Sequence, residues 1–314
     1  MGLRHSRIIG GMASTLHVTV PDAGWVDRLA DLDDIDLTVW DFASPQPERY
    51  VDIAVRPYTV AAAGLEVLDP ARIGLVQSQA LGFDGVEETL PAGISYANAV
   101  GVHEESTAEL AVALLLASQR EIDRYAREAG QWNRRFTASL IDRRIMLLGH
   151  GGIGIEVEKR LDGFGAVLVR VAGHRREDER GTIHGSDELS DLLPTVDVVV
   201  LAVPLTEATT GLVDDDFLAA LPDGAIVVNV SRGKVVDTDA VVRQSGRIRL
   251  AADVTDPEPL PPEHALWSTP GVLISPHVGG MSSAMQPRID AVVRRQVARL
   301  LEGKEPSDVV VPRR

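Results

Sequence analysis

The chain has 314 residues, of which 45% are hydrophobic, so it can bury a substantial core, and its length favours two domains over one. Its formal net charge of −15 argues against non-specific binding to nucleic acid or to an anionic membrane, because both would repel it. The absence of cysteine excludes disulfides, thiolate catalysis and zinc sites with sulfur ligands, and no other pattern in the sequence predicts a metal site.

The N-terminal residues 1–9 include Arg4 and Arg7 but lack the apolar run of a signal peptide. No later stretch of the sequence reaches the length of a membrane span. We therefore expect a soluble, cytoplasmic protein.

The first hundred residues alternate short apolar runs, typical of strands, with helical patterns such as residues 26–32. This alternation predicts an open, parallel sheet. A longer apolar segment, residues 106–118, predicts one long buried helix. The strands are expected at residues 37–40, 53–55 and 73–76.

A second alternating unit begins at Arg144. Its first strand, residues 145–148, precedes a glycine cluster, a helix over residues 155–161 and a strand over residues 166–171, which together predict a βαβ unit. Further apolar runs suit strands covered on both faces, and an apolar stripe predicts a last helix over residues 284–301. These later strands are expected at residues 196–203, 225–230, 250–254 and 272–275.

The glycine cluster of the βαβ unit has the Gly-x-Gly-x-x-Gly pattern of dinucleotide-binding turns. The first glycine permits a tight turn, the second lets a pyrophosphate approach the backbone, and the third allows the helix to pack closely on the strand. We expect the phosphates to lie at the helix N-terminus; the alternative is a glycine-rich turn without a ligand. The residues concerned are Gly149, His150, Gly151, Gly152, Ile153 and Gly154.

The residues that follow the strand expected at 166–171 predict which dinucleotide the protein prefers. An NAD-specific site usually carries an acidic residue there, which binds the ribose hydroxyls. In this sequence Ala172 occupies that position, and His174, Arg175 and Arg176 follow it. Because guanidinium groups bind phosphate through two parallel hydrogen bonds, we expect a preference for NADP(H), with NAD(H) as the alternative cofactor. A solvated basic loop, paired with the two acidic residues that follow it, is the competing interpretation.

Three later strands are followed by charged residues, at the sheet edge where open α/β sheets bind ligands. Reduction of a 2-keto acid needs a cation for the substrate carboxylate and a donor that protonates the carbonyl oxygen as hydride arrives. Arg232 suits the first role and His277 the second. Glu258, bonded to the other imidazole nitrogen, would hold the ring and favour its protonated form. Singly, each residue could be structural; together with the glycine motif they predict an active site.

Five motifs, at residues 149–154, 203–210, 229–233, 253–259 and 275–280, stand in the order of one known family. The chain resembles the D-isomer-specific 2-hydroxyacid dehydrogenases, which include glyoxylate and hydroxypyruvate reductases and phosphoglycerate dehydrogenases. The resemblance implies that Arg232, Glu258 and His277 are the catalytic residues of a D-specific oxidoreductase, and that Asp253 lies near the nicotinamide. The other residues that it implies for the cofactor site are Val203, Pro204, Thr209, Val230, Ser231 and Gly279.

The resemblance also implies a domain arrangement. A Rossmann dinucleotide-binding domain, residues 98–280, would be inserted into a smaller flavodoxin-like α/β substrate domain formed by residues 1–97 and 281–314. The helix after Ser106, with Trp132 beyond it, resembles the family's dimerisation region, so a homodimer is expected. For Trp132 the alternative is packing in the core.

In the substrate domain, the backbone amides of Leu81 and Gly82 resemble the family's grip on a substrate carboxylate, with an ordinary turn as the alternative. Arg56 is a weaker candidate for the wall of the substrate cleft. His150 departs from the family's apolar or aromatic residue, and we expect its ring to contact phosphate or solvent.

The sequence leaves the substrate open among small keto acids such as glyoxylate, hydroxypyruvate and pyruvate derivatives. Two other functions fit the same scaffold. One is a formate- or phosphite-type dehydrogenase, which would share the arginine and histidine. The other is a non-enzymatic, dinucleotide-sensing regulator of the corepressor type, because a fold alone does not settle function.

Overall fold

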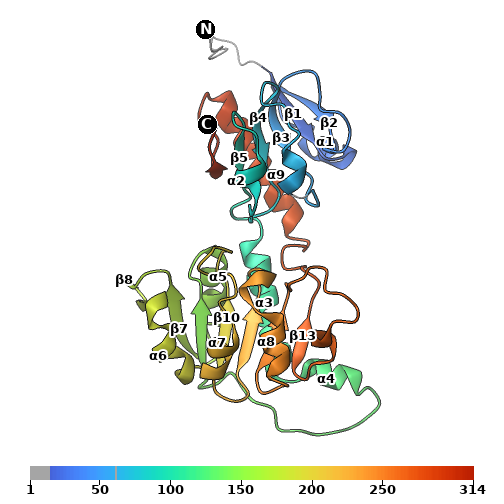
Figure 1. The fold of residues 1–314 in the computed structure, drawn as a ribbon. Coiled ribbons are helices and arrows are strands. Elements are labelled where there is room, and N and C mark those ends of the chain that lie inside the picture. The colour runs from blue at the N-terminus through green and yellow to red at the C-terminus, as the bar shows by residue number, and fades with distance from the viewer. Residues whose placement is uncertain (1–14, 61) are drawn as a thin grey trace. The chain divides into compact units, whose positions relative to one another are not determined.

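The computed structural model describes residues 15–60 and 62–314, so the N-terminal residues 1–9 lie outside the described part. The chain forms two compact units (Figure 1). The first combines the described part of Met1–His103 with Ser283–Arg314, and the second is the continuous segment Glu104–Ser282.

The first unit contains a six-stranded sheet in the order β14-β5-β4-β3-β1-β2, in which only β14 is antiparallel to its neighbour. The order 2-1-3-4-5 of its parallel strands is that of flavodoxin-like folds, as the sequence predicted. The elements are β1 Leu16–Val20, α1 Ala23–Leu29, β2 Ile35–Val39, β3 Val51–Val55, the 3-10 helix Ala62–Leu65, β4 Ile73–Gln77, α2 Val86–Thr89, β5 Ser95–Ala97, α9 Met285–Leu301 and β14 Val309–Val311.

Helix α9 closes one face of this sheet with an apolar stripe that includes Ile289, Val293 and Val297, all buried against strand residues such as Val18 and Ile53. The predicted helix over residues 284–301 is therefore confirmed. The rest of the α9 surface is strongly charged, and no helix in the described part of the chain is both long and apolar enough to cross a membrane.

Helix α1 begins three residues earlier than the predicted 26–32. The carboxylate of Asp22 accepts a hydrogen bond from the backbone N–H of Trp25, which caps the first turn and starts the helix at Ala23. The apolar pattern alone did not reveal this start.

Asp52, on β3, is a half-buried acid in the first unit, and burial raises its pKa although the His17 N–H donates to it at 2.8 Å. The folded protein therefore binds the proton of this carboxyl more tightly than the unfolded chain does. As a result, the stability of the fold decreases as the pH rises from the ordinary pKa of 3.8 through the raised pKa. We expect Asp52→Asn to raise the Tm at pH 7 by roughly 1–3 °C, a small gain because solvent partly screens this half-buried carboxylate. The gain should shrink as the pH falls toward the ordinary pKa. Thermal melts across this range test it, and a Tm lowered at neutral pH would contradict it.

The second unit contains an eight-stranded sheet in the order β13-β12-β11-β10-β6-β7-β9-β8, in which only β8 is antiparallel. Apart from the edge strands β8 and β13, this is the 3-2-1-4-5-6 order of a Rossmann fold, with the switch point between β6 and β10. The elements are α3 Glu104–Gln119, α4 Ile122–Arg127, β6 Arg144–Leu148, α5 Gly152–Leu161, β7 Val167–Ala172, β8 Arg176–Asp178, β9 Gly181–Gly185, α6 Leu189–Leu192, β10 Val198–Leu201, α7 Asp215–Ala220, β11 Ile226–Asn229, α8 Thr238–Arg243, β12 Arg249–Ala252 and β13 Val272–Ile274, with short 3-10 turns between them.

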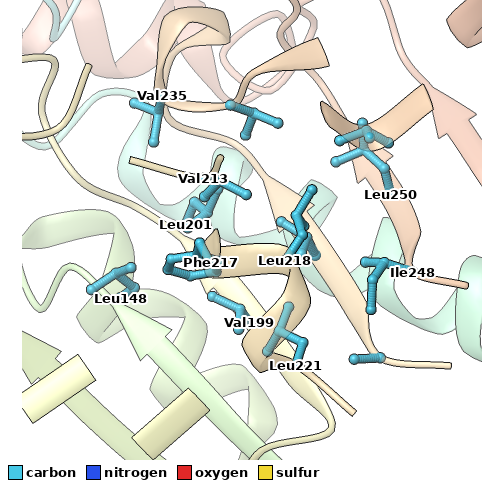
Figure 2. Close-up of a cluster of buried hydrophobic side chains, with 14 of the residues drawn as sticks. Leu148, Val199, Leu201, Val213, Phe217, Leu218, Leu221, Val235, Ile248 and Leu250 are labelled. Carbon is cyan, nitrogen blue, oxygen red and sulfur yellow. The ribbon is translucent and has the colours of Figure 1, made fainter. Parts of the chain in front are cut away.

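Both faces of this sheet are covered, which explains why its strands are apolar throughout. Along β10, Val199 and Leu201 join the cluster that packs against α7 and α8, which Figure 2 shows around Phe217 and Leu218. The alternate residues of β10 join the opposite cluster, beneath α3 and α5. Successive side chains of a strand thus point into two different apolar layers, one on each face of the sheet. The predicted long buried helix, α3, covers one of these layers.

Candidate active site

The turn between β6 and α5 shows why glycine is needed at two of its positions. Gly149 has a φ of +104°, and a Cβ atom there would lie 2.4 Å from the carbonyl oxygen of Ala202. A Cβ atom on Gly154 would lie 2.0 Å from the carbonyl oxygen of Gly149. At Gly151, by contrast, a Cβ would meet nothing within 4 Å. The turn is therefore tightly packed on its inner side and open at the N-terminus of α5, where a pyrophosphate fits.

His150 behaves differently from the sequence prediction. Its side chain is only 6% exposed, and Nε2 lies 2.7 Å from a carboxylate oxygen of the equally buried Glu158 on α5. The expectation of a solvent-exposed ring is wrong, and this ring nitrogen is committed to Glu158 rather than to a phosphate. Glu158 is also within 3.0 Å of Arg180 and 3.6 Å of the buried Arg170. The histidine therefore ties the glycine turn to a network of charges, and its backbone is the part left for a cofactor.

The loop after β10 lies on the other side of the switch point. Thr209 organises it, because its hydroxyl donates to the carbonyl of Pro204 at 2.7 Å and accepts from the N–H of Thr206 at 2.8 Å. The close approach of Gly149 to Ala202 and Val203 brings this loop against the glycine turn. The loop that contains the predicted cofactor residues Val203, Pro204 and Thr209 thus begins beside the switch point, where a Rossmann fold binds its ligand.

The basic cluster after β7 is partly paired. Arg175 Nη1 donates to Glu188 Oε2 at 2.7 Å, and His184 Nδ1 lies 2.7 Å from the same oxygen. The hydrogen bond from His184 chiefly lowers the pKa of Glu188 to about 2, with a further bond from the Gly185 N–H. Glu188 is therefore ionised at any physiological pH. Its pairing with Arg175, 13 residues away, was not predicted from the sequence.

The side chains of the remaining basic residues of the cluster, His174 and Arg176, make no hydrogen bond or ion pair with the other described residues. The competing interpretation paired the cluster with the two acids that follow it. Those acids have other partners: Asp178 binds Arg170 and Glu177 accepts from Thr182.

A histidine and a glutamate meet at the carboxyl edge of the sheet. His277 Nδ1 lies 2.5 Å from Glu258 Oε1, and the two side chains are 47% and 42% exposed. The bond fixes the ring through Nδ1 and leaves Nε2 as the nitrogen for proton transfer. The predicted pairing of these two residues is present in the structure.

Asp253 secures the loop that carries His277. It is 3% exposed, and its carboxylate accepts hydrogen bonds from the Ser275 hydroxyl at 2.6 Å and from the N–H groups of Val278 and Gly279 at 2.9 and 2.7 Å. Its carbonyl accepts the N–H of His277 at 2.7 Å. His277 itself adopts a φ of +54°, a conformation that these bonds stabilise. In the structure, Asp253 and Gly279 therefore position the histidine, a role that the sequence did not indicate.

Arg232 follows β11 in a loop that Asn229 holds. The Asn229 side-chain oxygen accepts from the N–H and hydroxyl of Ser231 at 3.0 and 2.7 Å, and its amide donates to the Arg232 carbonyl at 3.0 Å. Arg232 Nη1 donates to the Ser231 carbonyl at 2.7 Å. Ser231 and Val230 are buried. A Cβ atom on Gly233 would lie 1.9 Å from the Thr255 carbonyl oxygen, so this loop packs backbone to backbone against the one that leads to Glu258.

These loops share one edge of the sheet because β11, β12 and β13 are successive parallel neighbours. Arg232 follows the first strand, Glu258 the second and His277 the third. The edge thus combines a cation with a histidine–carboxylate pair, in the same unit as the glycine turn.

In the first unit, the loop after β4 is pinned through its carbonyl groups. The Asn98 amide donates to the Leu81 carbonyl at 2.8 Å, the Ala99 N–H donates to the Ala80 carbonyl at 3.0 Å, and His103 Nε2 lies 2.5 Å from the Gln79 carbonyl. Within the described residues, the N–H groups of Leu81 and Gly82 have no partner. Two unpaired amides on a rigid loop suit an anion such as a carboxylate.

Arg56 lies inside the first unit rather than on its surface. It is 9% exposed, and its guanidinium donates to the Tyr96 hydroxyl at 2.5 Å and to the Val60 carbonyl. The backbone carbonyl of Arg56 accepts the Gln79 amide at 2.9 Å. This environment supports a role in holding the loop after β4, and it does not support the predicted place on a cleft wall.

Both a family profile and individual protein sequences match this chain. The profile described as "D-isomer specific 2-hydroxyacid dehydrogenase, NAD binding domain" matches residues 112–279, more than half of the chain. The glyoxylate reductase of Pyrococcus horikoshii is 33% identical over 264 residues, which cover 78% of each chain.

Two solved structures have the same fold. The NADPH-dependent glyoxylate/hydroxypyruvate reductase of Sinorhizobium meliloti is 25% identical, with a TM-score of 0.77 over 96% of this chain and 99% of that one. The NAD-dependent formate dehydrogenase of Staphylococcus aureus is 22% identical, with a TM-score of 0.75 over 95% and 99%, a likeness that shows the fold alone. The chain is therefore an NAD(P)-dependent oxidoreductase acting on CH–OH donors, and it belongs to the D-isomer specific 2-hydroxyacid dehydrogenase family.

Proposed function

We propose that this enzyme reduces a small 2-keto acid, such as glyoxylate or hydroxypyruvate, to the D-2-hydroxy acid, with NADPH as the preferred reductant. The observation that carries the proposal is the His277–Glu258 hydrogen bond at the same sheet edge as Arg232. Similarity to glyoxylate reductases supports the substrate class.

In the proposed reaction, a bound dihydronicotinamide supplies the hydride that the substrate's carbonyl carbon accepts. The guanidinium of Arg232 binds the substrate carboxylate and polarises the carbonyl. His277 donates the proton on Nε2 to the carbonyl oxygen as negative charge develops there. Glu258 stabilises the protonated ring through Nδ1, and Asp253 holds the loop so that the ring keeps its place.

The amides of Leu81 and Gly82 are the proposed second contact for the substrate carboxylate. Their N–H groups carry no charge, so they would orient the acid rather than neutralise it. We assign this role to the first unit because these two amides have no partner among the described residues, while hydrogen bonds to its carbonyl groups hold the loop.

The preference for NADPH rests on the end of β7. Ala172 supplies no carboxylate for ribose hydroxyls, while Arg175 and Arg176 supply cations for a 2′-phosphate. The structurally similar reductase of S. meliloti is described as NADPH-dependent, which supports the same assignment here.

The test is the loss of dihydronicotinamide absorbance with NADPH and NADH against glyoxylate, hydroxypyruvate and pyruvate. A higher kcat/KM with NADPH and one of these acids, and a D-configured product where the acid yields a chiral one, would support the proposal. Oxidation of formate or phosphite, with the keto acids inert, would replace it by the other dehydrogenase class. Cofactor binding without turnover of any of these substrates would favour the regulatory function.

We further propose that the enzyme is a homodimer and that a second copy covers the segment between α4 and β6. This segment runs as a long irregular loop at the border of its unit (Figure 1). Trp132 is 89% exposed and Phe136 fully exposed, so packing of Trp132 in the core of its own unit is ruled out. Ile141, in the same segment, contributes to a hollow of about 490 Å³ lined also by Leu116 and Phe164. Exposed aromatic groups and a partly apolar hollow are features typical of a subunit interface.

The double change Trp132→Ala and Phe136→Ala is expected to shift the enzyme from dimer to monomer in light scattering after size exclusion. Aromatic residues that are buried on association commonly contribute 2 kcal/mol or more each, so the dissociation constant should rise by roughly a hundredfold or more. Val67→Ser removes another largely exposed apolar side chain, in the first unit, and should leave the dimer intact. A dimer unaffected by the double change would contradict this interface.

A further inference from the structure

The carboxylate that pairs with Arg175 is also held by two other groups. Glu188 is fixed independently of Arg175, because Oε1 accepts the Gly185 N–H at 2.9 Å and Oε2 lies 2.7 Å from His184 Nδ1. Arg175 then adds a third bond to this anchored carboxylate, from Nη1 at 2.7 Å. The arginine is thus held by a group that does not depend on it.

Only one edge of the guanidinium is used. Within the described residues, Nε and Nη2 of Arg175 have no partner, and the side chain is 56% exposed. These are the donors that a phosphate needs for a bidentate contact.

We infer that Glu188 is a positioning residue for cofactor selection, which holds Arg175 ready to bind the 2′-phosphate of NADP(H). The inference rests on the proposed NADPH preference and adds the residue that makes Arg175 effective. Glu188 does not contact the phosphate; it acts through Arg175.

Preorganisation is the physical reason. A free arginine loses side-chain entropy when it binds a phosphate, and a prior ion pair removes part of that loss from the binding step. The opposing effect is repulsion between the phosphate and the carboxylates of Asp187 and Glu188, which water and salt screen at an exposed site. The two effects have opposite signs, so a single substitution distinguishes them.

The experiment measures binding of 2′,5′-ADP and of ADP by calorimetry, without turnover. The unchanged enzyme should bind 2′,5′-ADP more tightly than ADP. We expect Glu188→Ala to weaken 2′,5′-ADP by about fivefold to tenfold and ADP by less than about twofold. Retained ADP binding shows that the variant is folded. Glu179→Gln removes one negative charge from the exposed turn after β8 and should change neither affinity by more than about twofold.

A second variant tests the route through Arg175. In an Arg175→Ala background, Glu188→Ala should have no further effect on 2′,5′-ADP, because the residue on which Glu188 acts is gone. Unchanged or tighter binding of 2′,5′-ADP to the Glu188→Ala single variant, with the preference of the unchanged enzyme intact, would overturn the inference. Equal binding of both ligands to the unchanged enzyme would instead overturn the proposed NADPH preference.

Discussion

Replacing His277 by alanine is expected to lower kcat for keto-acid reduction by roughly 10²- to 10⁴-fold, the contribution that a positioned general acid makes. The structure gives the reason: Glu258 holds the ring through Nδ1, and the Asp253 carbonyl holds the backbone of His277, so the proton donor is positioned before the substrate binds. Steady-state kinetics with saturating NADPH measure the effect. Retention of more than about a tenth of kcat would show that the proton comes from elsewhere.

Glu258→Gln tests how much of the effect of Glu258 on His277 comes from orienting the ring and how much from its negative charge. The glutamine oxygen can still accept the ring N–H, but it offers no negative charge to the protonated ring. Because a hydrogen bond to a charged group contributes about 1.5–3 kcal/mol, we expect a loss of roughly 10- to 100-fold, smaller than that of His277→Ala. NADPH affinity should be unchanged in both variants. A weakened affinity would mean that the loops had shifted rather than that catalysis had been impaired.

The sequence predicted the fold well where apolar periodicity is strong. The strands beneath α3 and α7 are apolar on both faces, and the glycine cluster was correctly predicted to connect a strand to a helix. Shorter elements were missed because their formation depends on tertiary pairing. β8 consists of three exposed polar residues, Arg176 to Asp178, which form a strand only because β9 lies beside them.

Some residues of the candidate site could likewise be predicted from the sequence, and others could not. Residues with charged side chains in a glycine- or proline-marked loop, such as Arg232 and His277, could be found from the sequence. Their supports could not: Asn229 and Ser275 are ordinary polar residues whose partners depend on the loop geometry. Glu158 lies 8 residues from His150 and Glu188 lies 13 residues from Arg175, so only the fold brings each of these pairs together.

Gly233→Ala is expected to reduce kcat/KM by about 100-fold or more without altering any charged or polar side chain. The new Cβ would lie 1.9 Å from the Thr255 carbonyl oxygen and 2.8 Å from the Asp256 N, both backbone atoms, so the two loops must separate. One of these loops carries Arg232 and the other leads to Glu258, and a displacement of about 1 Å at reacting groups can cost 10²-fold in rate.

Stability and cofactor binding show whether this loss is local. We expect the Tm of Gly233→Ala to fall by several degrees, as for other overpacked sites, while NADPH still binds at the glycine turn. Gly24→Ala is the matched control, because a Cβ at this exposed position of α1 meets only the ends of the Asp22 and Arg28 side chains. Wild-type kcat/KM in Gly233→Ala would show that the spacing of the two loops does not govern the placement of Arg232 and Glu258, and the assignment of this sheet edge as the catalytic site would then need another basis.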